Sequence, residues 1–152
     1  MPDITPELIA FILEAKRQTY AGGGAHSPSS RPSSVDLPYR RGDYFYLDSY
    51  LGGFNFLGEE AVWKKETPLW GMNYHGYMLI PEVPEGFGEF LKRALLEAPP
   101  ETPYRGPEVY QEGDFDYRCE WEGEPELFEG RETILLQGEP IYELIFHGGV
   151  IK

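Results

Sequence analysis

The feature of this sequence that most restricts its fold is a segment that occurs twice. The first copy runs from Gly42-Asp43-Tyr44 to His75-Gly76, and the second runs from Gly113-Asp114-Phe115 to His147-Gly148. Pairs at an offset of 71 are Tyr39/Tyr110, Gly42/Gly113, Asp43/Asp114, Tyr46/Tyr117 and Gly52/Gly123, and pairs at an offset of 72 are Phe56/Phe128, Gly58/Gly130, Glu60/Glu132, Pro68/Pro140, His75/His147 and Gly76/Gly148. We interpret this register, which holds through three apolar segments, as an internal duplication. The alternative is that two hairpin-rich segments share residues only because turns require Gly and Pro.

Each copy is preceded by a helical pattern. Thr5 followed by Pro6 is a typical helix start, and apolar residues then recur at helical spacing. Helices are expected over residues 6 to about 20 and 87–97, and strands over 43–51, 54–65, 69–77, 114–122, 126–137 and 139–147. The sequence therefore predicts an α+β fold of two αβββ units, with a curved antiparallel sheet and two helices packed on one side. Residues 1–152 would form a single domain with repeats at about 6–80 and 87–152.

Composition excludes several classes of function. The chain has 152 residues, 41% of them hydrophobic, and a formal net charge of −13, so direct binding to nucleic acid is not expected. Cys119 is the single cysteine, which rules out an internal disulfide and fits a reducing compartment. No apolar run reaches the roughly 20 residues of a membrane span, and Met1–Thr5 lacks the pattern of a signal peptide. We expect a small, soluble, cytoplasmic protein that does not interact with membranes.

Acidic residues fall on the face of the sheet that should be buried. In residues 115–122 apolar side chains alternate with charged ones, which indicates one buried and one wet face. The same register directs Asp48, Glu60 and Glu132 inward. A buried carboxylate is costly unless it is paired, hydrogen-bonded or protonated, so these residues suggest a pocket for a cation or donor. Two structural alternatives remain: tyrosine hydroxyls or Arg131 satisfy the acids, or a bulge turns Glu60 to solvent.

The leading hypothesis is a small-molecule binding or sensing site at the junction of the halves, for a cationic or aromatic ligand. The expected anchors are Glu60 and Glu132 together with Asp48, and the expected walls are Tyr46, Trp63, Trp70 and Tyr142. Residues 21–38 form a long Gly-, Pro- and Ser-rich loop, which we interpret either as a lid anchored by Arg31 or as a mobile surface loop.

Two other classes of function stay open. A protein-interaction or homo-oligomerisation module would use Phe45, Leu47 and Leu51 on the second sheet face. A hydrolase would combine a carboxylate with His75 or His147, but these histidines lack metal-site spacing and the serines lack a nucleophile motif. We therefore predict no catalytic residues, no metal and no cofactor.

Several motifs resemble those of a known family. They are Thr19-Tyr20-Ala21-Gly22, Ser30-Arg31-Pro32, Gly42-Asp43-Tyr44, Asp48-Ser49-Tyr50, Gly58-Glu59-Glu60 with Val62-Trp63, Met72-Asn73-Tyr74, Pro103-Tyr104-Arg105-Gly106-Pro107 and Tyr142-Glu143-Leu144 with Phe146-His147-Gly148-Gly149. Nearly the whole chain resembles a family of uncharacterised bacterial domains that occur alone or C-terminal to Xre-type helix-turn-helix domains. The resemblance implies a sensory or interaction role and no catalytic residues. The plan of the fold is also similar to the Gyrase-inhibitor-like effector-binding domains, in which two α/β repeats form a groove and several members bind cationic aromatic compounds.

Overall fold

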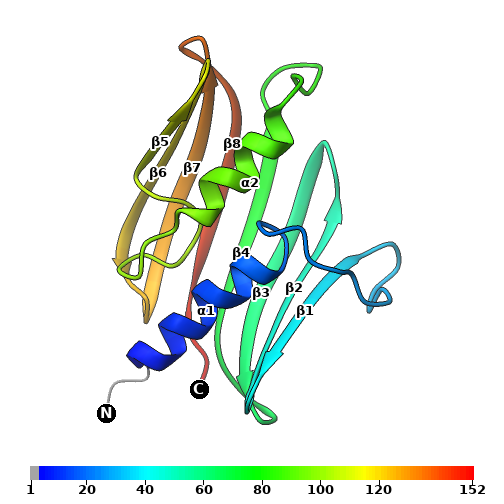
Figure 1. The fold of residues 1–152 in the computed structure, drawn as a ribbon, viewed down its shortest axis with the longest axis vertical. Helices are drawn as coiled ribbons and strands as arrows, with labels where there is room; N and C mark the ends of the chain where they lie inside the picture. Colours follow the sequence, from blue (N-terminus) through cyan, green and yellow to red (C-terminus); the bar gives the residue numbers. More distant parts are fainter. Residues whose placement is uncertain (1–3) are drawn as a thin grey trace.

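The computed structural model describes residues 4–152 and contains one antiparallel sheet of eight strands, with two helices on one of its faces (Figure 1). The elements in chain order are α1 (Pro6–Gln18), β1 (Val35–Arg41), β2 (Tyr44–Gly52), β3 (Asn55–Lys64), β4 (Thr67–Met78), α2 (Phe87–Leu96), β5 (Val109–Glu112), β6 (Phe115–Glu124), β7 (Leu127–Leu136) and β8 (Glu139–Val150). The predicted α+β class is confirmed. Residues 1–3 lie outside the described residues. They belong to the stretch Met1–Thr5, in which the sequence shows no signal-peptide pattern.

Both helices form where the sequence predicts them. Thr5 caps α1 because its Oγ1 accepts a hydrogen bond from the Leu8 amide at 3.1 Å, and Pro6 occupies the first helical position. The apolar stripe of α1 packs on the sheet through Phe11, whose ring stacks on Tyr44 with centroids 5.0 Å apart. Neither helix within residues 4–152 is long and apolar enough to cross a membrane.

The strand order β1-β2-β3-β4-β8-β7-β6-β5 places β4 and β8 at the centre of the sheet and β1 and β5 at its edges. The prediction of three strands in each half was wrong, because each half contributes four. The additional strands, β1 and β5, lie where the sequence predicted no strand, and β1 begins within the expected loop of residues 21–38. Pro38 lies within β1, and a proline is tolerated there because an edge strand does not need every amide for pairing.

The strand registers of the two halves correspond. Asp48 pairs with Glu60, which pairs with Met72, and in the other half Cys119 pairs with Glu132, which pairs with Leu144. All these side chains are buried on the helix-covered face, which confirms the predicted inward register. The register of β3 with β4 shifts only after Val62, so this irregularity does not turn Glu60 to solvent.

Candidate functional site

Five charged side chains are buried together beneath the helices. They are Lys16 on α1, Asp48 on β2, Glu60 on β3, Arg105 in the segment between α2 and β5, and Glu132 on β7, and each is less than 10% exposed. Burial of a charge is stable only when a counter-charge or several hydrogen bonds satisfy it. The partners of each carboxylate therefore decide which of them can meet a ligand.

Glu60 is neutralised within the chain. Lys16 Nζ lies 2.6 Å from Glu60 Oε1, and the Tyr46 hydroxyl donates to the same oxygen at 2.6 Å. Lys16 Nζ also donates to the backbone oxygen of Tyr104 at 2.7 Å. These bonds connect α1, the sheet and the segment after α2, so Glu60 has a structural role in joining them.

Glu132 is satisfied even more completely. Arg105 binds it through two parallel hydrogen bonds, Nε to Oε2 and Nη2 to Oε1, each 3.0 Å long. The hydroxyls of Tyr117 and Tyr142 also donate to this carboxylate. Burial alone would lower the pKa of Arg105, but the charge and hydrogen bonds of Glu132, together with Tyr142 and Tyr117, outweigh it and raise that pKa well above its usual range.

Asp48 is the third carboxylate of this cluster, and among residues 4–152 it has no cation of its own. The Tyr74 hydroxyl donates a hydrogen bond to its Oδ1, whereas Lys16 and Arg105 form their ion pairs with the two glutamates. Burial, followed by the negative charge of Glu60, raises the pKa of Asp48 to about 7. The cluster thus contains three acids and two bases, and Asp48 is the group with an unmatched charge.

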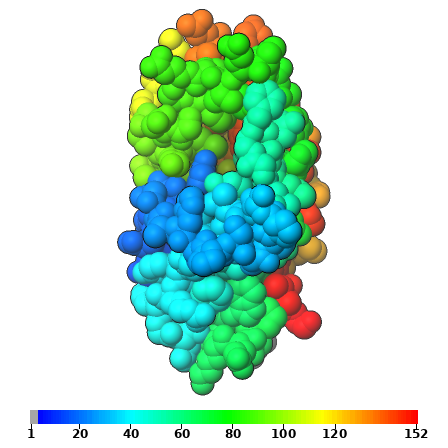
Figure 2. Space-filling view, turned by 90° about the vertical axis from the view of Figure 1, so that its right-hand side faces the viewer, coloured from blue at the N-terminus to red at the C-terminus, as the bar shows by residue number. Residues whose placement is uncertain are grey.

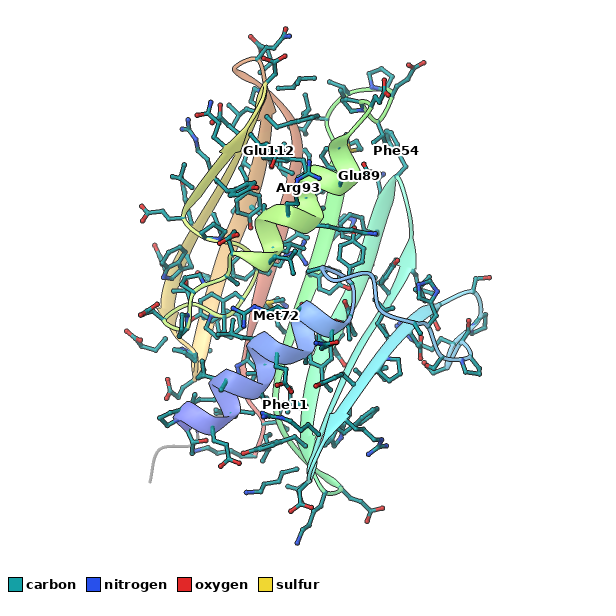
Figure 3. The ribbon with its side chains drawn as sticks, viewed as in Figure 1. Phe11, Phe54, Met72, Glu89, Arg93 and Glu112 are labelled. Atoms are coloured by element: carbon teal, nitrogen blue, oxygen red, sulfur yellow. The ribbon has the colours of Figure 1, made fainter. Side chains whose placement is uncertain are left out.

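A cavity of about 340 Å³ opens beside Asp48. In Figure 2 the surface is hollowed between the green segment that includes α2 and the teal tip of the β2–β3 hairpin. Phe54 lies at this tip, near the loop that leads into α2 (Figure 3). The apolar part of the lining comes from Tyr20, Tyr50, Phe54, Phe56, Tyr74, Met78, Val83, Phe87, Leu91 and Tyr142. Asp48 and Arg105 supply the charged part, so the cavity is aromatic with a small polar floor.

A smaller space of about 20 Å³ shares Tyr20, Asp48 and Arg105 with the cavity. Lys16 and Glu60 also line this space. Its volume is close to that needed for one water molecule, and its polar lining could hydrogen-bond one. The polar floor of the cavity is therefore continuous with the Lys16–Glu60 pair.

Comparison with known proteins assigns the chain to a family. Residues 48–151, more than half of the chain, match the family described as Domain of unknown function DUF5680. The chain belongs to this family. No curated protein and no solved structure matches the chain. The DUF5680 match includes Asp48, Glu60, Arg105 and Glu132, whereas Lys16 and Tyr20 precede it.

The structure brings together some of the residues that the sequence singled out in this DUF5680 member. Asp48 and Tyr142 line the cavity, and Tyr46 and Glu60 line the smaller space. Glu132 lines neither, and contacts the cavity lining through its hydrogen bonds with Arg105 and Tyr142. Asp48, rather than either glutamate, is thus the acidic group that faces the cavity.

Two predicted wall residues lie elsewhere. Trp63 was expected to be a wall, but it packs against Phe45 on the sheet face away from the helices, with ring centroids 5.4 Å apart. Trp70 is buried against Phe128, and its Nε1 donates to the backbone oxygen of Pro125 at 3.0 Å. Neither indole lines the cavity.

Of the two interpretations of residues 21–38, a lid anchored by Arg31 is wrong, because none of these residues lines the cavity beside Asp48. Arg31 Nη2 donates to Ser49 Oγ at 2.6 Å, and Ser49 follows Asp48 on β2, so its side chain points to the opposite face. Ser27 forms a bridge with Asp36, which fixes residues 27–36 along the β1–β2 edge. Among residues 21–38, Ala21 lines the smaller space, and none lines the larger cavity.

Sequence reasoning missed the two cations. Lys16 follows Ile12 by one helical turn and so continues the buried stripe of α1, a pattern that could have revealed it. Arg105 stands in an irregular segment between prolines, where no periodicity shows that its side chain turns inward. Its partner, Glu132, is 27 positions away in the sequence.

The two histidines do not join the acidic cluster. His75 and His147 are exposed and alternate along their strands with the buried Tyr74 and Phe146, which places them on the opposite sheet face. Within residues 4–152 no group of His, Cys, Asp and Glu could hold a metal ion. The hydrolase hypothesis paired a carboxylate with His75 or His147, and neither histidine lies on the sheet face that holds Asp48, Glu60 and Glu132.

Proposed function

We propose that this protein binds a small, largely apolar molecule in the cavity between α2 and the β2–β3 hairpin. The observation that carries the proposal is the combination of a 340 Å³ aromatic cavity with one buried carboxylate, Asp48, that has no counter-ion of its own. Ligand sites are typically concave, mainly apolar and about 300–1,000 Å³ in volume, with a few polar groups that orient the ligand.

The chemistry at Asp48 favours a ligand that carries a cation or a hydrogen-bond donor. Since Glu60 and Glu132 already have cationic partners, only Asp48 gains a counter-charge when a cation enters. The rings of Tyr50 and Tyr74 beside it would add cation–π attraction. The net charge of −13 also draws cations toward the molecule.

Titration calorimetry with an aromatic monocation, 2-naphthylmethylamine, tests this function. A hydrogen bond to a charged group contributes about 1.5–3 kcal/mol, so Asp48→Asn should lower the affinity by about tenfold or more. Glu59→Gln is the matched control, because Glu59 lies on β3 with an exposed side chain and should leave binding unchanged. Equal binding by the wild type and Asp48→Asn would show that Asp48 is not the anchor.

The correspondence of the halves supports a duplication as the origin of this site. The strands β2–β4 and β6–β8 pair in matching registers, with Glu60 and Glu132 at equivalent positions. In this proposal, one of the two halves has become the ligand site, which would fit the sensory role that the resemblance implies. 2-Naphthylmethylamine should stabilise the wild type and a Cys119→Ser variant against unfolding, but not Asp48→Asn. Cys119 is at the position equivalent to Asp48, so this result would assign ligand binding to the first half.

A second candidate function is self-association through the sheet face that the helices leave uncovered. Leu57 and Ile145 are 56% and 45% exposed and flank His75 along one row of paired strands. Exposed apolar side chains on an uncovered sheet face can contribute to an interface. Light scattering should then show a dimer that Leu57→Lys dissociates, and a wild-type chain that is monomeric at all concentrations would remove this candidate.

A further inference from the structure

The half of the molecule without the cavity indicates which chemical group would fit the cavity in the other half. In both halves a phenylalanine of the middle strand covers a glycine of the next strand. A Cβ built on Gly76 would lie 2.3 Å from the Phe56 ring, and a Cβ built on Gly148 would lie 2.9 Å from the Phe128 ring. These contacts require glycine, and they hold Phe56 and Phe128 in equivalent places on the sheet.

The surroundings of the two phenylalanines also correspond. Tyr142 of β8 stacks beside Phe56 with centroids 6.3 Å apart, and Trp70 of β4 stacks beside Phe128 at 5.7 Å. A second ring follows the same pattern. The Tyr74 ring on β4 lies 6.0 Å from the Phe56 ring, and the equivalent Phe146 ring on β8 lies 6.2 Å from the Phe128 ring. The two sites therefore share the same frame of rings.

Tyr104 marks the difference between these sites. It comes from the segment between α2 and β5, is 1% exposed, and stacks on Phe128 with centroids 4.0 Å apart and planes 18° from parallel. Around Phe56 the neighbouring rings lie 6.0–6.5 Å away, and the cavity adjoins it. The nearest counterpart of Tyr104 in the first half is Tyr20, which meets Tyr50 edge-on at 6.2 Å at the cavity wall.

We infer that the ligand presents a flat aromatic ring, which stacks on Phe56 in the place that Tyr104 occupies on Phe128. This inference rests on the proposed function and defines the ligand further: an aromatic ring at Phe56, joined to a donor or cationic group that reaches Asp48. Stacked ring pairs gain an attraction beyond the burial of their area, and a purely aliphatic ligand of the same volume would not gain it. The hydroxyl of Tyr104 has no hydrogen-bond partner among the described residues, so the ring itself is the recognised feature.

A matched pair of amines tests the inference. 2-Naphthylmethylamine and its fully saturated decalin counterpart carry the same charge and have similar volumes, but only the first is aromatic. We expect the naphthyl compound to bind about two- to tenfold more tightly, which corresponds to the extra contribution of an aromatic pair. Phe56→Leu should remove this preference while the saturated amine binds as before. Phe45→Leu, on the opposite sheet face, is the control and should retain it.

The possible outcomes separate this inference from the function on which it rests. Binding of both amines with equal affinity, or with a preference that persists in Phe56→Leu, would overturn the stacking but leave ligand binding intact. Binding of neither amine would overturn the proposed function and the inference together. Intermolecular nuclear Overhauser effects between naphthyl protons and the Phe56 ring are expected in the complex, and their absence from a complex that does form would also overturn the stacking.

Discussion

The two halves of this molecule share one strand register but differ in how the space above the sheet is filled. The half that contains β6–β8 is filled, because Tyr104 stacks on Phe128 and Arg105 binds Glu132 through two hydrogen bonds. The half that contains β2–β4 is open, and a cavity adjoins Phe56. The segments that follow the two helices differ: residues 102–106, after α2, are buried, whereas Tyr20, after α1, lies at the cavity wall and Ser27 forms a bridge with Asp36 of the edge strand β1. The same strand frame can therefore hold a packed core or an open cavity.

The largest expected effect is at the ion pair of the filled half. Arg105→Ala leaves Glu132 buried without its cation, which should reduce the free energy of unfolding by about 3–5 kcal/mol. Arg131→Ala breaks the ion pair with Glu143, in which the arginine side chain is about half exposed, and should cost about 1 kcal/mol or less. Urea denaturation of both variants makes the comparison, and equal losses would contradict the central role of the Arg105–Glu132 pair.

The equivalent phenylalanines should respond differently to truncation. Phe128→Ala removes a ring packed against Tyr104 and Trp70 and should cost about 3–5 kcal/mol. Phe56→Ala should cost at least about 1 kcal/mol less, because its ring borders existing open space and less new cavity is created. Thermal or chemical denaturation measures the difference, and a larger loss for Phe56→Ala would mean that the first half is not the open one.

Asp48 should make stability depend on pH. The groups that face Asp48 are Glu60, Tyr74, Lys16 and Arg105, and burial raises its pKa to about 7 in the folded chain. Between about pH 4 and pH 7 the unfolded chain gives up this proton while the folded chain keeps it, so this residue lowers stability as the pH rises. Asp48→Asn does not have this pH dependence. Between pH 4 and pH 7 we therefore expect its free energy of unfolding to rise by about 2–4 kcal/mol relative to that of the wild type.

Denaturation curves of the wild type and Asp48→Asn across this pH range measure the effect. Asp116→Asn serves as the control. Asp116 is the second residue of β6, and it lies on the sheet face opposite to that of the buried Tyr117 and Cys119. Parallel pH profiles for the wild type and Asp48→Asn would show that Asp48 ionises normally in the folded chain.

The smallest effect is expected at Tyr104. Tyr104→Phe keeps the ring on Phe128 and removes a buried hydroxyl that has no partner among the described residues. The variant should be as stable as the wild type or more stable by up to about 1 kcal/mol. A loss of more than about 1 kcal/mol in thermal denaturation would indicate that the hydroxyl contributes a hydrogen bond to the packing.

The sequence predicts the parts of this structure that local patterns determine. Alternation along the strands placed Asp48, Glu60 and Glu132 on the buried face, and the cap at Thr5 placed the first helix. Patterns of this kind do not show which side chains meet across the fold. Lys16 reaches Glu60 over 44 positions and Tyr104 over 88, so the neutralisation of Glu60, and hence the importance of Asp48, required the structure.

The walls of the site were hard to predict for a related reason. Trp63 and Trp70 are large aromatic residues near the acids in sequence, but one lies on the other sheet face and the other fills the second half. The cavity depends on where loops and helices leave space, and Tyr20, Phe87 and Arg105 all come from outside the central strands. Strand periodicity carries no information about those positions.

Methyl NMR of the methionines tests the central claim most directly, because Met78 lines the cavity whereas Met72 is 1% exposed and does not line it. On titration with 2-naphthylmethylamine we expect the Met78 methyl signal to shift in a saturable manner while that of Met72 changes little. Asp48→Asn should weaken this response. A saturable shift at Met72 without one at Met78, or no saturable shift at either methyl, would contradict a ligand site in the open half.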